Sequence, residues 1–181
     1  CWVLGNDYDV NKFMDCFSKM EGSRLYKIKC LKDQGNYLFT KECYLEAMSR
    51  YGNACQILCF MVEVMEGFDS KAFSDLGISL NLNLAACALK QSEYENEKIF
   101  CSLVLNFFPN NVKALFPRAL AFMKLKMYLE AKYDLEKALL SQPKNLDILR
   151  ELEVVNGELK INCNGKSQLN AVVASKMVPM V

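Results

Sequence analysis

The sequence predicts an all-α fold, a solenoid of three helical hairpins with a capping helix at the C-terminal end and a short helix before the first hairpin. The main observation is a repeat with a period of 34 residues, because Pro109 and Pro143 end two consecutive units that begin at Ile78 and Val112. A hairpin of this length cannot bury its apolar face alone and must stack on its neighbours. The period therefore predicts a binding scaffold rather than an enzyme.

Small and aromatic residues recur at equivalent positions of these two units. Ala85 and Ala119 lie in the first helix of each unit, where two helices must come into contact. Tyr94 and Tyr128 lie where the second helix of each unit begins. These recurrences mark the two helices of each hairpin.

An earlier unit aligns with the other two when it begins at Ile28. Small residues then recur at matching positions: Gly35 with Ala85 and Ala119, Ala47 with Ala131, and Ala54 with Ala138. The distance from Ile28 to Ile78 shows that the earlier unit carries about 16 extra residues. We expect them to lengthen its second helix and the loop that follows.

Apolar residues at helical spacing predict each helix in turn. The expected helices cover residues 9–19, 25–39, 44–65, 76–90, 93–107, 111–125, 128–140 and 146–160. Asn145 is expected to cap the last helix, and 67–74 is expected to be a turn region. The expected domain boundaries are an N-terminal extension 1–24, a repeat domain 25–160 and a flexible tail 161–181, with repeats at 28–73, 78–111 and 112–145.

Composition excludes several classes of protein. The chain has 181 residues, of which 52% are hydrophobic and 24% charged, and this balance is typical of a globular domain. The net charge of +1 gives no reason to expect nucleic acid or an anionic membrane as the main partner. No segment approaches the roughly 20 apolar residues of a membrane span. Residues 1–9 lack the features of a secretory signal, and the missing initial Met leads us to expect part of a longer protein.

Cysteine and histidine usage argues against a metal site. The chain has nine cysteines and no histidine, and no C-x-x-C pair occurs. We therefore expect neither a metal nor a cofactor. Dispersed cysteines, odd in number, are typical of a reducing compartment, so a cytoplasmic or nuclear location is expected. No nucleophile and base pair, carboxylate dyad or glycine-rich phosphate loop has a usable spacing, so no catalytic residue is predicted.

Three segments resemble the tetratricopeptide repeat (TPR), and more narrowly the TPR region of large FKBP-type immunophilins. They are LKDQGNYLF at 31–39, NLNLAAC at 81–87 and NVKALFPRA at 111–119. The resemblance covers about residues 25 to 160 and implies a right-handed superhelix whose concave groove is lined by the first helix of each hairpin. In that family the groove usually takes the acidic C-terminal tail of heat shock protein 90 or heat shock protein 70. The isomerase domain of such proteins would lie before this chain.

A groove that binds a peptide's terminal carboxylate needs cationic donors and amides. Lys32 and Asn36 are four residues apart, so they share one face of a helix. Asn83 holds the repeat position of residue 117, one turn after Lys113. These four residues match four of the five members of the family's carboxylate clamp. Without the resemblance, Lys32 and Lys113 would be interpreted as solvated surface lysines.

The fifth clamp member is ordinarily arginine, and here it is Pro117. Arg118 is the next residue, but one position along a helix is about 100° round its axis. We therefore expect Arg118 to point away from the groove unless the helix is distorted. Pro117 lies inside the predicted helix, where it removes a hydrogen bond to the carbonyl of Lys113 and favours a kink.

Three functional interpretations remain open at this point. The first is a non-catalytic adaptor that binds a chaperone tail through the partly retained clamp. The second is a diverged scaffold whose clamp is lost and whose partner binds another surface. In the third, the chain is the C-terminal part of an FKBP-type peptidyl-prolyl isomerase whose catalytic domain lies outside it. The sequence does not predict an oligomeric state.

Overall fold

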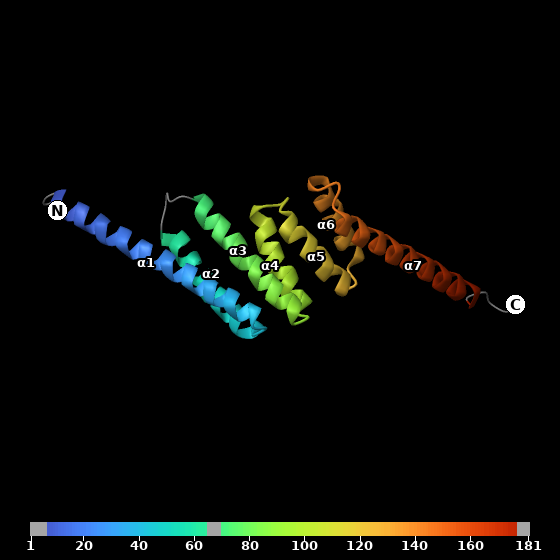
Figure 1. Cartoon of the computed structure of the whole chain (residues 1–181). Helices are drawn as coiled ribbons and strands as arrows, with labels where there is room; N and C mark the ends of the chain where they lie inside the picture. The colour runs from blue at the N-terminus through green and yellow to red at the C-terminus, as the bar shows by residue number, and fades with distance from the viewer. Residues whose placement is uncertain (1–6, 65–69, 177–181) are drawn as a thin grey trace. The chain divides into compact units, whose positions relative to one another are not determined.

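The computed structural model describes residues 7–64 and 70–176, and within them the side chains of residues 22–61, 71 and 73–162. Seven helices and no strand occur in these ranges (Figure 1). They are α1 (Asp7–Thr40), α2 (Tyr44–Val64), α3 (Ser70–Lys90), α4 (Tyr94–Phe107), α5 (Val112–Lys124), α6 (Tyr128–Ser141) and α7 (Leu146–Lys176). The all-α prediction is confirmed.

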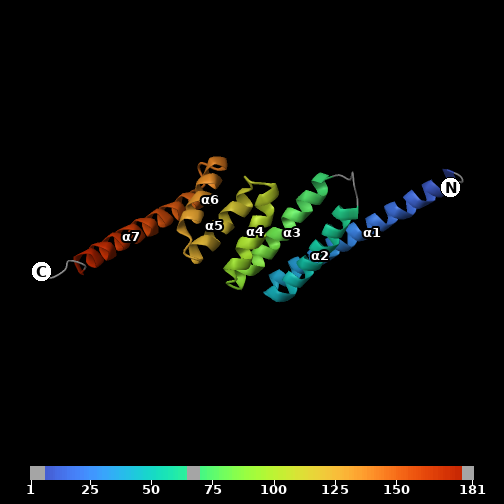
Figure 2. The same ribbon diagram turned by 180° about the vertical axis from the view of Figure 1, so that it is seen from behind.

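The chain divides into two compact units, residues 1–87 and residues 88–181. The first unit holds α1, α2 and most of α3. The second holds α4 to α7, in which each helix packs on the next one along the chain. The hairpin of α1 and α2 is recognisable from both sides of the molecule (Figures 1 and 2).

The same tight turn joins the two helices of every hairpin. A residue with positive φ follows each first helix, at Glu42, Ser92 and Lys126, with φ values of 61°, 60° and 60°. The next amide donates to a carbonyl five residues back: Cys43 to Leu38, Glu93 to Ala88, and Met127 to Phe122. This is the 6→1 hydrogen bond of a Schellman ending. The three hairpins therefore share one register, as the sequence alignment predicted.

Gly35 allows the ring of Tyr51 on α2 to pack directly against the backbone of α1. A Cβ atom at this position would lie 2.5 Å from Cε1 of Tyr51, so only glycine fits against the ring. Tyr51 is 2% exposed and belongs to the core of the first unit. Two turns along α2 from Tyr51, Leu58 would lie 3.5 Å from a Cβ at Gly77 of α3, an ordinary contact distance.

In the second unit, small and aliphatic residues fill the interfaces between successive helices. Ala114 and Ala119 of α5 are fully buried, as is Leu135 of α6. Asn145 caps α7, because its Oδ1 accepts hydrogen bonds from the amides of Asp147 and Ile148 at 3.1 and 3.3 Å. The predicted cap is thus confirmed.

Several helix ends differ from the prediction. α1 is one helix from Asp7 to Thr40, in place of separate helices at 9–19 and 25–39. α3 begins at Ser70 inside the predicted turn region, and residues 65–69 lie outside the described part. α7 runs to Lys176 instead of ending near 160, so residues 161–176 of the predicted tail are helical. Exposed glycines inside a helix cost only about 1 kcal/mol each and do not end it. Residues 177–181 are outside the described part.

No helix in the described ranges combines the length and the apolar character needed to cross a bilayer.

Candidate functional site

Two of the predicted clamp residues, Asn36 and Asn83, meet in the first unit. Asn36 lies on α1 and Asn83 on α3, so they come from the first helices of two successive hairpins. The Asn83 side-chain amide donates to Oδ1 of Asn36 at 3.2 Å. The two residues are 47 positions apart in the sequence, so local geometry does not bring their amides together. Their contact requires the hairpins to stack in register.

A buried tyrosine also forms a hydrogen bond with this amide pair. The hydroxyl of Tyr51 donates to the same Oδ1 of Asn36 at 2.8 Å. The pKa of Tyr51 is raised to about 12, chiefly by burial, with a smaller increase from the nearby Cys87 thiol and a decrease from a hydrogen bond with Asn83. Tyr51 is therefore a protonated donor at neutral pH. The sequence analysis missed this residue as part of the site.

Lys32 and Lys113 lie on the first helices of two different hairpins, in different units. Lys32 lies on α1, one helical turn before Asn36, and is half-buried. Lys113 lies on the first turn of α5 in the second unit and is exposed. The structure forms no ion pair for either lysine within its described side chains.

Pro117 lies inside α5, which continues as a helix from Val112 to Lys124. The side chain of Pro117 is half-buried. The chain therefore has no cationic side chain at the fifth clamp position.

Arg118 is held by the neighbouring helices of its own unit. Its Nε and Nη2 donate to the two carboxylate oxygens of Asp134 on α6, at 2.7 and 2.8 Å. Its Nη1 donates to the hydroxyl of Ser102 on α4 at 3.1 Å, and its guanidinium lies 5.6 Å from the centre of the Phe122 ring. The hydrogen bonds with Asp134 are the main cause that raises the pKa of Arg118. Both lobes of the guanidinium are engaged, so Arg118 does not serve as a substitute for the missing clamp arginine.

Glu97 on α4 is a second buried carboxylate that the sequence analysis missed. It is fully buried, and neither of its oxygens has a hydrogen-bond partner among the described residues. Burial raises its pKa from 4.5 to about 7. The signal was available, because the repeat aligns Glu97 with Ala47 and Ala131 of the other hairpins.

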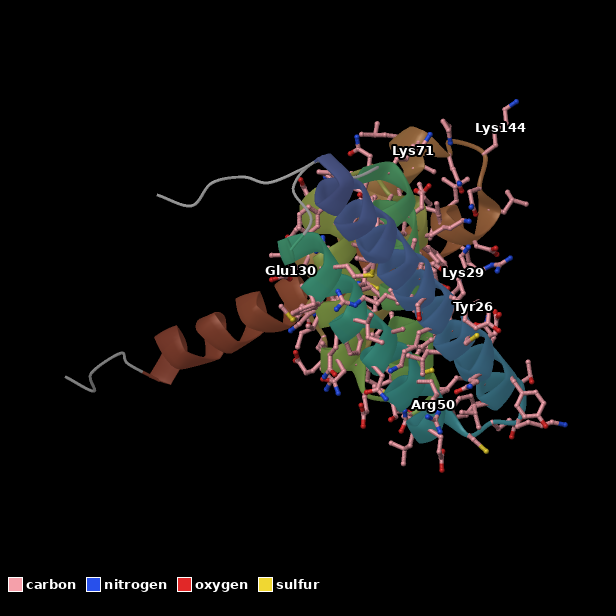
Figure 3. All side chains as sticks on the ribbon, turned by 90° about the vertical axis from the view of Figure 1, so that its left-hand side faces the viewer. Tyr26, Lys29, Arg50, Lys71, Glu130 and Lys144 are labelled. Atoms are coloured by element: carbon pink, nitrogen blue, oxygen red, sulfur yellow. The ribbon has the colours of Figure 1, made fainter. Side chains whose placement is uncertain are left out.

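A shallow surface depression lies in each unit. In the first unit, a volume of about 450 Å³ is lined by Asp33, Gln34, Tyr37 and Leu38 of α1 and by Arg50 of α2, which is labelled in Figure 3. In the second unit, a volume of about 370 Å³ lies beside Arg118, between Phe122 and Tyr133. Neither depression is lined by a predicted clamp residue. No cluster of three or more potential metal ligands was found in the part of the chain that the structure describes.

Comparison with known sequences identifies relatives that are longer than this chain. No family model matches it. It is 30% identical over 133 residues to human sperm-associated antigen 1, a match that covers 74% of this chain and 13% of the relative. It is 25% identical over 169 residues to FK506-binding protein 59 of Drosophila melanogaster, covering 93% of this chain and 37% of the relative. The chain thus spans well under half the length of these relatives.

Solved structures share the fold. The C-terminal TPR-containing domain of an FK506-binding protein from Plasmodium falciparum superposes with a TM-score of 0.68 and 33% identity, over 78% of this chain and 93% of that domain. The second TPR domain of human RPAP3, solved in complex with the HSP70 peptide SGPTIEEVD, has a TM-score of 0.59 and 25% identity over 74% of this chain and 98% of that domain. Because a third of the aligned residues are identical to those of a TPR domain, over nearly the whole of that domain, the chain belongs to the tetratricopeptide-repeat family and resembles the C-terminal TPR region of FK506-binding proteins.

Proposed function

We propose that this chain is a non-catalytic adaptor that binds the acidic C-terminal peptide of heat shock protein 90 or heat shock protein 70. As a TPR domain it is a protein-interaction module, and a related domain carries the HSP70 peptide SGPTIEEVD. The observation that carries the proposal is the hydrogen-bonded pair of Asn36 and Asn83, with Lys32 one turn away on α1. The clamp is proposed to consist of Lys32, Asn36, Asn83 and Lys113.

The chemistry of the pair suits a carboxylate ligand. A carboxylate only accepts hydrogen bonds, so it needs N–H donors and benefits from a positive charge. Lys32 supplies the charge, and it has no competing carboxylate among the described side chains. The amide nitrogens of Asn36 and Asn83 supply uncharged donors beside it. Lys113 is included because it holds the clamp position of the third hairpin.

Pro117 lowers the expected affinity of this clamp. A charge-assisted hydrogen bond to a carboxylate contributes roughly 1.5–3 kcal/mol, which corresponds to about a tenfold to hundredfold change in the dissociation constant. Arg118 does not restore the bond because Asp134 holds its guanidinium. We therefore expect weak, micromolar binding that weakens further with salt.

Calorimetry with the peptide SGPTIEEVD tests the proposal on the intact chain. Lys32→Ala should weaken binding about tenfold or more, since it removes the charged donor. Lys29→Ala is the matched control, because Lys29 is exposed on the same helix, outside the proposed clamp (Figure 3). The absence of wild-type binding at millimolar peptide would refute the proposal.

The contribution of Lys113 needs its own arm of the experiment. Lys113→Ala should weaken binding as Lys32→Ala does, while Lys124→Ala at the exposed end of the same helix should leave it unchanged. Equal affinities for the two α5 variants would remove Lys113 from the clamp.

A diverged scaffold with a lost clamp is the alternative, and the engaged Arg118 together with Pro117 favours it. Pro117→Arg separates the two interpretations. If the clamp works, the substitution strengthens an existing affinity by about tenfold. If the clamp is lost, wild type does not bind and Pro117→Arg creates binding.

The cellular setting is part of the proposal. Six cysteines lie among the described side chains, and none of them forms a disulfide. Cysteines of this number without disulfides agree with a reducing cytoplasmic or nuclear location. The match to part of an FK506-binding protein also supports a parent protein with a peptidyl-prolyl isomerase domain.

A further inference from the structure

We propose that Tyr51 is a positioning residue that sets the orientation of the Asn36 carboxamide, so that its NH₂ group faces a bound carboxylate. This inference rests on the proposed function and extends it to a residue outside the clamp. Its basis is the convergence of two donors, the Tyr51 hydroxyl at 2.8 Å and the Asn83 amide at 3.2 Å, on Oδ1 of Asn36.

The hydroxyl proton of Tyr51 decides which end of the amide faces inward. A carboxamide has one accepting oxygen and one donating nitrogen, and a flip by 180° exchanges them. If Asn36 flipped, the Tyr51 proton would lose its acceptor in a buried site, and two NH₂ groups, those of Asn36 and Asn83, would face each other. With Oδ1 directed inward, the nitrogen of Asn36 is directed away from both donors. The pKa of Tyr51 is raised to about 12, so its hydroxyl keeps the proton at neutral pH.

The ring of Tyr51 has no freedom to move away from Asn36. It is 2% exposed and lies against Gly35, where even a Cβ atom would be 2.5 Å from Cε1. Gly35 is the residue immediately before Asn36 in the chain. The glycine therefore lets the ring come close enough for its hydroxyl to reach the Asn36 amide.

The other hairpins show that packing alone does not require this hydroxyl. The repeat aligns Tyr51 with Cys101 and Leu135, which are also buried but offer no comparable donor. It aligns Asn36 with Ala86 and Leu120. A polar pair thus occurs together in the first hairpin, at two positions that are small or apolar in the other two.

An oriented NH₂ group gives the site a preference among peptide ends. A free C-terminal carboxylate accepts from it, whereas an amidated end presents its own donors. We expect the orientation to favour the free acid, and loss of the Tyr51 hydroxyl to reduce that preference.

The experiment compares Tyr51→Phe with wild type, using SGPTIEEVD as the free acid and as the C-terminal amide. Tyr51→Phe should weaken binding of the free acid about fivefold and leave binding of the amide almost unchanged. Tyr37→Phe is the matched control, because Tyr37 is 63% exposed and follows Asn36 directly. The inference would be overturned if the ratio of the affinity for the free acid to the affinity for the amide were the same in wild type and in Tyr51→Phe.

A double variant tests whether Tyr51 acts through Asn36. In an Asn36→Ala background, Tyr51→Phe should have no further effect on peptide affinity, because the amide that it orients is gone. A full additional loss in the double variant would show that Tyr51 acts by another route and would refute the positioning role.

A measurement on the free protein separates this inference from the proposed function. The side-chain ¹H–¹⁵N resonances of Asn36 should shift and broaden in Tyr51→Phe and stay in place in Tyr37→Phe. If wild type does not bind the peptide, the proposed function fails, and the Asn36 resonances still decide the role of Tyr51. Unchanged resonances in Tyr51→Phe, with an unfolding midpoint close to wild type, would overturn the inference.

Discussion

The second unit buries two carboxylates, Glu97 on α4 and Asp134 on α6, in opposite electrostatic settings. Asp134 is 1% exposed and receives two hydrogen bonds from Arg118. Glu97 is fully buried and has no hydrogen-bond partner among the described residues. The difference teaches that the cost of burying a carboxylate depends on its partners, and without one the burial of Glu97 raises its pKa to about 7.

The repeat explains how this contrast arose. Glu97 takes the position of Ala47 and Ala131, which lies in the helix interface of each hairpin, so its carboxyl group enters a space built for a methyl group. One turn later, the pKa of Cys101 is raised to about 12, chiefly by burial, with a smaller increase from Glu97 and a decrease from Arg118. Arg118 makes its hydrogen bonds to Asp134 and Ser102 instead of Glu97.

Removing the cation tests the paired side of the comparison and has the largest expected effect. Arg118→Met leaves Asp134 buried without its partner, which should lower the free energy of unfolding by about 3 kcal/mol. Urea denaturation followed by circular dichroism measures the change.

Arg150→Met is the matched control for this variant. Arg150 pairs with Asp147 at 3.3 Å, but both side chains are about 70% exposed. Solvent screens such a pair, so the expected change is within about 0.5 kcal/mol. Equal effects of the two substitutions would contradict the view that burial makes the Asp134 pair important.

Neutralising Glu97 tests the unpaired side. Its pKa is higher in the folded state, about 7 against an ordinary 4.5, so the folded protein binds the proton more tightly. Below pH 4.5 the buried Glu97 carboxyl group is protonated in both states and its titration costs no stability. Its contribution to the free energy of unfolding falls as the pH rises from 4.5 to 7, and is constant above pH 7. Glu97→Gln removes the titration and should raise the free energy of unfolding by about 2 kcal/mol at pH 8, with little change at pH 4.5.

The difference between Glu97→Gln and wild type, measured across this range, cancels the titration of all other groups. A difference that stays constant from pH 4.5 to pH 8 would show that Glu97 has an ordinary pKa. Glu136→Gln is a control, because Glu136 is more than half exposed and its pair with Lys132 is long, at 3.6 Å.

The repeat period was sufficient to predict the hairpins but not all of their ends. The three turns at Glu42, Ser92 and Lys126 follow from one register, which the spacing of small residues had already established. The ends of α1 and α7 could not be predicted because Gly22 and Gly157 are tolerated inside exposed helices. Only contacts with the rest of the fold decide such ends.

The candidate site was predictable to the extent that it follows the repeat. Spacing placed Asn36 and Asn83 on equivalent first helices, and the structure brings them together, while their role in binding stays a prediction. The contact of Tyr51 with Asn36 depends on how two antiparallel helices face each other, which a period does not contain. Glu97 was predictable, since the same period aligns it with alanines.

Ser102 offers the smallest and most specific test of the comparison. Its hydroxyl accepts from Nη1 of Arg118 at 3.1 Å and donates to the carbonyl of Lys98 at 2.8 Å. Ser102→Ala should lower the free energy of unfolding by about 0.5 kcal/mol, because the lost hydrogen bond is partly offset by the better helix propensity of alanine. Ser49→Ala, at an exposed position of α2, measures the propensity gain alone.

A double-mutant cycle of Ser102→Ala with Arg118→Met then isolates the contact between the two side chains. We expect a coupling energy of about 0.5–1 kcal/mol if Ser102 helps to hold the guanidinium against Asp134. Zero coupling would mean that the two bonds to Asp134 hold Arg118 without help from α4. The contrast with Glu97 would then depend on a single ion pair between α5 and α6, and α4 would hold an unpaired carboxylate with no part in neutralising the paired one.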